Sequence, residues 1–167
     1  MNKEIKKVTL IAIFISLALV LSYVDNLINI YRAIPGFKLG IANIAIIYAL
    51  YKIGVKEAIL ISLMRIILSS ILFGNVVSMA YSLAGAVLSL SLMILLKNVF
   101  NFSIITVSIV GALMHNIGQI IMAIILLSAK EILYHLPVLL VTGTISGIGV
   151  GILSILVLKY TKNIRTV

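Results

Sequence analysis

The sequence predicts an all-α polytopic membrane protein, built as a bundle of six transmembrane helices. Of its 167 residues, 63% are hydrophobic and only 10% are charged, and the mean hydropathy is +1.31. Soluble domains carry about 25% charged residues. Apolar stretches close to the roughly 17 to 25 residues of a spanning helix recur along the chain, with turn-forming residues between them. Because no polar linker divides the chain, we expect residues 1–167 to form a single membrane domain.

Three apolar segments are predicted in the first half of the chain, at residues 8–24, 36–51 and 57–73. A lysine-rich start precedes the first segment and resembles a signal peptide, but no clear Ala-x-Ala cleavage site follows it. We therefore expect this segment to be retained as a span. Asp25-Asn26 and Pro35-Gly36 separate the first two segments, and Gly54 separates the second from the third, because these residues favour turns.

The second half of the chain predicts three further segments, at residues 76–96, 102–128 and 136–158. Gly74-Asn75 precedes the first of them, a polar stretch from Asn98 to Asn101 follows it, and Pro137 stands at the start of the last.

The distribution of basic residues predicts the orientation of the bundle. With both termini on one side of the membrane, that side would hold nine bases: Lys3, Lys6, Lys7, Lys52, Lys56, Lys97, Lys159, Lys162 and Arg165. The opposite side would hold three, Arg32, Lys38 and Lys130. Cytoplasmic loops carry the excess of Lys and Arg. We therefore expect a multi-pass protein of the cell membrane with both termini in the cytoplasm. The net charge of +9 is then a topological signal and does not indicate nucleic acid binding.

Arg65 lies in the middle of the third apolar segment, and the predicted topology puts no acidic residue at its depth. An arginine at the bilayer centre costs from about 2.5 to more than 10 kcal/mol, so it usually faces a bundle interior or a watery cavity. Ser62, Arg65 and Ser69 follow a helical spacing and share one face. Because guanidinium donors suit carboxylate or phosphate, Arg65 predicts a site for a small anionic or polar solute. In the structural alternative, backbone carbonyls, Asn116 and water satisfy it.

A second polar group falls in the fifth segment, where His115, Asn116 and Gln119 run from the midplane toward the outer third. These side chains have two readings of equal weight: they contact the solute, or they hold helices together, as polar groups in membrane bundles commonly do. At the outer end, we expect further candidates to line or gate the mouth of the cavity: Lys38, Asn43 and Asn75.

Small residues at four-residue spacing mark two helices for close packing. Gly143, Gly147 and Gly151 form one face of the last segment, with Gly149 alongside. In the first segment, the small residues fall into two pairs that could meet another helix or a partner subunit: Ala12 with Ser16, and Ala18 with Ser22.

Composition argues against an enzyme. The chain has no cysteine, and Asp25 is its one aspartate among four acidic residues. Magnesium prefers oxygen ligands, and the chain has no pair of acidic residues to hold this ion. No phosphate-binding loop of the ATPase type is present. His115 has no second histidine or acid nearby to complete a metal site. We expect no cofactor and no metal.

Several motifs resemble the Gx transporter family, also labelled heptaprenyl diphosphate synthase component I. They are Gly36-Phe37-Lys38-Leu39-Gly40-Ile41-Ala42-Asn43, Tyr48-Ala49-Leu50-Tyr51, Lys56-Glu57-Ala58, Ser62 with Arg65, Phe73-Gly74, Ser82-Leu83-Ala84-Gly85 and the run from Gly111 to Gln119. That family is in turn similar to the substrate-binding S components of energy-coupling-factor (ECF) vitamin transporters.

The resemblance implies a six-helix bundle that binds a solute on its outer side. It also implies partners: a transmembrane coupling subunit and two cytoplasmic ATPases. Small residues of the first helix contact the coupling subunit in that group, so Ala12, Ser16, Ala18 and Ser22 are the matching candidates. The group's usual Ala-x-x-x-Ala reads Ala12-x-x-x-Ser16 in this chain. The segment 25–34 would be a lid over the cavity. The alternative function is a noncatalytic membrane accessory protein of isoprenoid or quinone synthesis.

Overall fold

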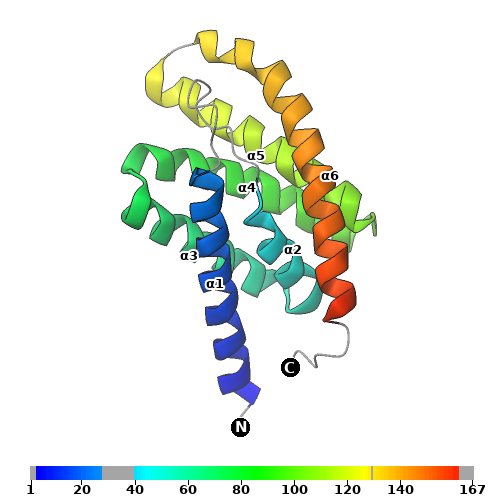
Figure 1. Ribbon diagram of the computed structural model, residues 1–167. Helices are drawn as coiled ribbons and strands as arrows, with labels where there is room; N and C mark the ends of the chain where they lie inside the picture. The colour runs from blue at the N-terminus through cyan, green and yellow to red at the C-terminus, as the bar shows by residue number, and fades with distance from the viewer. Residues whose placement is uncertain (1–2, 28–39, 129, 162–167) are drawn as a thin grey trace.

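The computed structural model describes residues 3–27, 40–128 and 130–161, and every regular element in these ranges is helical. In chain order, the elements are α1 (Lys3–Leu27), α2 (Asn43–Lys52), α3 (Val55–Phe73), α4 (Val76–Asn98), α5 (Ile104–Leu127), the short 3-10 helix η1 (Lys130–His135) and α6 (Leu136–Tyr160). The start of α1 and the end of α6 lie at the same end of the molecule (Figure 1).

Local sequence signals explain where several helices begin. Asn75 caps α4: its side chain accepts a hydrogen bond from the main-chain nitrogen of Ser78 at 2.7 Å, and the Ser78 hydroxyl accepts one from the nitrogen of Asn75. Ser103 caps α5 in a similar way, through the nitrogen of Thr106. Pro137 stands in the first turn of α6, where a missing N–H costs nothing.

Four stretches of the described chain are long and apolar enough to cross a membrane: Glu4–Leu27, Val76–Asn98, Ile104–Leu127 and Glu131–Tyr160. Their outward surfaces carry large aliphatic side chains such as Val8, Val87 and Ile145, each more than half exposed. The predicted helical membrane protein is confirmed at this level. The 19 residues of α3 also reach about 28 Å, but three charged residues, Lys56, Glu57 and Arg65, fall within that length.

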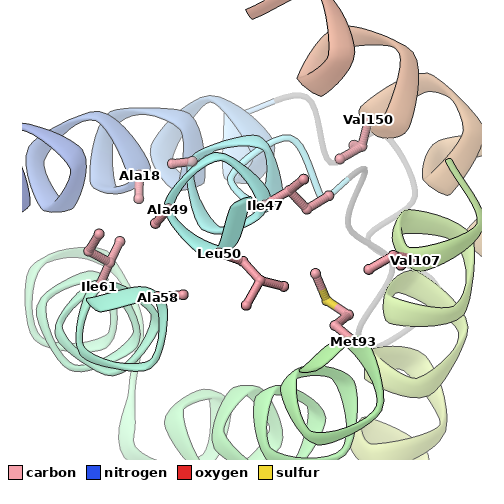
Figure 2. Packing of buried hydrophobic residues seen from close by; sticks show 10 residues of the cluster. Ala18, Ile47, Ala49, Leu50, Ala58, Ile61, Met93, Val107 and Val150 are labelled. Carbon is pink, nitrogen blue, oxygen red and sulfur yellow. The ribbon is translucent and has the colours of Figure 1, made fainter. Parts of the chain in front are cut away.

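Helix α2 is short and occupies the middle of the bundle. Six consecutive residues, from Ala45 to Leu50, are buried. Figure 2 shows α2 with the core side chains of its neighbours around it, among them Ile61 of α3, Met93 of α4 and Val107 of α5. Its ten residues rise only about 15 Å, half of a hydrocarbon core. The second predicted segment, 36–51, therefore contains a buried half-length helix, and six membrane crossings remain a prediction.

The most extensive contacts between helices join α5 to α4 and to α6. Glycine makes both possible. A Cβ atom at Gly118 would lie 2.6 Å from the main-chain oxygen of Ala84 in α4, and one at Gly147 would lie 2.7 Å from the Cα atom of Ile109 in α5. The same test at Gly149 finds open space. The predicted glycine face of the last helix thus packs within the chain, on α5.

Candidate functional site

A cavity of about 240 Å³ lies where the last turns of α1 and α3 meet the first turns of α4. The described residues that line it are Ser22, Asp25, Asn26, Arg65, Ile66, Ser69, Ser70, Phe73, Gly74, Asn75, Ser78 and Ser82. All but Ile66, Phe73 and Gly74 have polar side chains. Such a polar lining is unusual, because ligand pockets are mostly apolar with only a few polar groups. We refer to this space as the main cavity.

Arg65 borders the main cavity from α3 and is half-buried. Its Nη1 donates a hydrogen bond of 3.3 Å to the Ser22 hydroxyl, which itself donates to the main-chain oxygen of Ala18. The Nε atom of Arg65 is buried and has no hydrogen-bond partner among the described residues. The guanidinium group thus retains donor capacity beside the cavity.

Asp25 shares the site with Arg65, and this corrects the expectation that no acid lies at the depth of Arg65. The Asp25 side chain is 4% exposed, borders the same cavity and attracts Arg65 electrostatically. It also makes a further interaction within the protein. The sequence suggested a turn at Asp25-Asn26, but α1 continues through Leu27 and carries Asp25 inward. Residues 28–34 of the predicted lid lie outside the described residues.

A second, much smaller pocket of about 30 Å³ adjoins the same two charged residues. It is lined by Asp25, Gly40, Asn43, Arg65, Ala112, His115, Asn116 and Ser146. A space of this size can hold a water molecule where polar partners surround it. Four of the predicted site residues, on three helices, therefore meet in one place: Asn43, Arg65, His115 and Asn116.

Two polar side chains of α5 hold α6 in place. Asn116 Nδ2 donates to the main-chain oxygen of Leu139 at 2.8 Å, and Ser108 Oγ donates to that of Gly147 at 2.7 Å. Asn116 thus fits both readings of the sequence, since it binds helices together and also borders the small pocket. Gln119 is buried but is not among the residues that line either cavity.

The remaining candidates fall in different surroundings. Asn75 lines the main cavity while it caps α4. Lys38 lies outside the described residues. On α1, Ala12 and Ser16 are exposed, whereas Ala18 is fully buried within the chain and Ser22 accepts the bond from Arg65. Whether any of these four contacts a partner stays a prediction.

Sequence reasoning missed Asp25 and most of the serines around the cavity. The signal for Asp25 was its spacing from Ser22, three residues earlier, which puts both on one helical face. Among the described residues, no group of three histidine or acidic side chains is arranged to hold a metal ion.

Comparison with known proteins identifies the family. The family model for heptaprenyl diphosphate synthase component I matches residues 14–157, most of the chain. No curated protein and no solved structure matches. The resemblance to ECF S components is therefore not confirmed by these comparisons. The family match agrees with the motifs around Arg65 and His115. The chain belongs to the heptaprenyl diphosphate synthase component I family.

Proposed function

We propose that this chain is a membrane-embedded binding subunit without a catalytic centre of its own, and that its main cavity holds a small polar or anionic solute. The observation that carries the proposal is the polar lining around Arg65 in a bundle whose outer surface is apolar. A charged residue inside the membrane is energetically costly, and such residues commonly mark the pathway or binding site of a substrate. The Arg65 guanidinium group and the serine hydroxyls of the lining can supply hydrogen bonds for a solute.

One candidate role is solute capture for an ATP-driven uptake transporter of the ECF type. In this role a transmembrane coupling subunit and two cytoplasmic ATPases move a vitamin-like solute or precursor. The position of the cavity supports it: the cavity lies at the end of α1 that is remote from the N-terminus. If the lysine-rich termini are cytoplasmic, the cavity faces outward, where an uptake protein meets its solute.

The second candidate role is a noncatalytic membrane accessory protein of heptaprenyl diphosphate synthesis. The description of the family favours this role over transport. Arg65 would then hold a diphosphate group, since guanidinium donors bind phosphate oxygens well. Among the described residues, only Ile66 and Phe73 offer apolar side chains in the cavity, so we expect a prenyl chain to lie outside it, in lipid.

Affinity purification of the tagged protein in mild detergent distinguishes the two roles. Mass spectrometry would identify both the co-purifying proteins and any small molecule released on denaturation. A coupling subunit with ATPases and a stoichiometric solute supports uptake, whereas a prenyl synthase without ATPases supports the accessory role. The Arg65→Gln variant should keep its protein partners and lose the small molecule. A small molecule retained unchanged by that variant, correctly folded, would contradict the proposed cavity.

A further inference from the structure

The main cavity offers charges of both signs. Arg65 contributes a cation from α3 and Asp25 contributes a carboxylate from α1, and both residues line both cavities. The side chains attract one another electrostatically. A ligand with a single net charge would be attracted by one of these groups and repelled by the other. A ligand that carries both signs would gain from each.

The helix ends around the cavity repeat this pattern. Asn75 and Ser78 in the lining belong to the start of α4, where the helix dipole is positive. Phe73 and Gly74 belong to the end of α3, where the dipole is negative and no basic residue stands in the last turn. The negative end of α3 and the positive end of α4 therefore lie side by side at the cavity, where Gly74 is followed by Asn75.

The remaining lining fits a compact and hydrophilic ligand. The hydroxyl groups of Ser70 and Ser82 can both donate and accept hydrogen bonds, whereas that of Ser69 donates to the main-chain oxygen of Ile66 and can still accept one. The volume of about 240 Å³ lies below the 300 to 1,000 Å³ that is common for drug-sized ligands.

We propose that the main cavity selects a small zwitterion, with an acidic group toward Arg65 and an amino group toward Asp25. This inference rests on the proposed binding function and narrows its ligand from anionic or polar solutes in general to those that carry both charges. Arg65 and Asp25 then act as a matched pair, one for each end of the ligand.

Three matched probes test the proposal on the purified full-length protein: β-alanine, propionate and propylamine. They share a three-carbon scaffold and differ in whether the anion, the cation or both are present. Binding to the folded state raises the melting temperature, and at a fixed ligand concentration the tighter ligand raises it more. We expect β-alanine to bind about tenfold more tightly than either single-charge probe, because one charge-assisted hydrogen bond is worth about that factor.

Two variants separate the contributions of the pair. Asp25→Asn should abolish the preference for β-alanine over propionate, and Arg65→Gln should abolish the preference over propylamine. Ser91→Ala is the control, since Ser91 is exposed and bonds only within its own helix. If the Arg65→Gln variant does not fold, the Asp25→Asn variant alone tests the proposal, through its loss of the preference for β-alanine over propionate.

An equal or absent response of the wild type to the three probes overturns the inference, as does a wild-type preference for propionate. Neither result contradicts the proposed binding function, because a stoichiometric solute recovered in the affinity purification would still support that function. Loss of both the probe response and the co-purified solute would remove the two proposals together.

Discussion

Lys97 connects the end of α4 to the buried helix α2, because its Nζ donates a hydrogen bond to the main-chain oxygen of Leu50, 47 positions earlier. The ammonium group also lies 5.2 Å from the centre of the Tyr51 ring. Cations are favourable at a helix C-terminus, where carbonyl groups are left without partners. The sequence assigned Lys97 only to membrane orientation, and the structure adds a capping role for it.

Replacing Lys97 by methionine should therefore destabilise the protein by about 1.5 to 3 kcal/mol, since a buried carbonyl loses a charged donor. Lys97→Arg, which keeps a donor, should lose less. Lys159→Met is the control, because Lys159 is exposed in the last turn of α6 and should cost less than about 1 kcal/mol. Thermal unfolding in detergent measures all three. Equal losses for Lys97→Met and Lys159→Met would contradict the capping role.

Asn116 should contribute to the attachment of α6 through its bond to Leu139. Asn116→Leu is expected to cost about 0.6 kcal/mol, the average measured for hydrogen bonds between membrane helices, and at most about 1.7 kcal/mol. Ser108→Ala should cost a similar amount, since its bond to Gly147 joins the same two helices. Denaturation in mixed detergent would compare them with Ser91→Ala, whose hydroxyl bonds within α4. A loss for Ser91→Ala as large as that for Asn116→Leu would refute the assignment.

The glycines of α5 and α6 should differ sharply in their tolerance of alanine. Gly118→Ala and Gly147→Ala put a methyl group against backbone atoms that cannot move aside, so each should cost about 1 to 3 kcal/mol. Gly149→Ala is the matched control, because its new methyl meets nothing within 4 Å and the helix gains propensity. Melting temperatures of the three variants test this. Equal melting temperatures for all three would show that the helices do not pack as described.

Cysteine labelling should reveal the orientation of the bundle. Because the chain contains no cysteine, a single introduced thiol gives an unambiguous signal. We expect a membrane-impermeant thiol reagent to modify Asn26→Cys in intact cells, since Asn26 is exposed at the main cavity. Asn98→Cys, at the opposite end of α4, should react only after the cells are opened. The reverse pattern would place the cavity in the cytoplasm and exclude direct capture of an external solute.

Most of the helices could be predicted from the sequence, because a long apolar stretch between turn residues is typical of a membrane-spanning helix. It also brought Arg65, His115 and Asn116 together through helical spacing and depth. The position of Asp25 in the site was not predicted, because the dipeptide Asp25-Asn26 is typical of a turn. In the structure, α1 continues to Leu27. Hydropathy cannot detect a charged residue that extends a helix beyond its apolar part and turns inward.

The short length of α2 could not be predicted from the sequence, for a different reason. A helix that is apolar all round is buried, but the pattern does not say whether lipid or protein buries it. Residues Ala45 to Leu50 are enclosed by protein, so their hydropathy matches that of a spanning segment without the corresponding length. Only the arrangement of α1, α3 and α6 around α2 distinguishes the two cases, and that arrangement involves contacts between distant parts of the chain.

The enclosure of α2 also constrains how the protein is made. The ribosome synthesises Asn43–Lys52 before α3, α4, α5 and α6, which later surround it. Ten residues are too few to cross a bilayer alone, and the unpaired main-chain groups at the ends of so short a helix would lie within the hydrocarbon core. We therefore expect this segment to reach its buried position only after its neighbours are in place. Damage to the later helices should then leave α2 accessible to proteases.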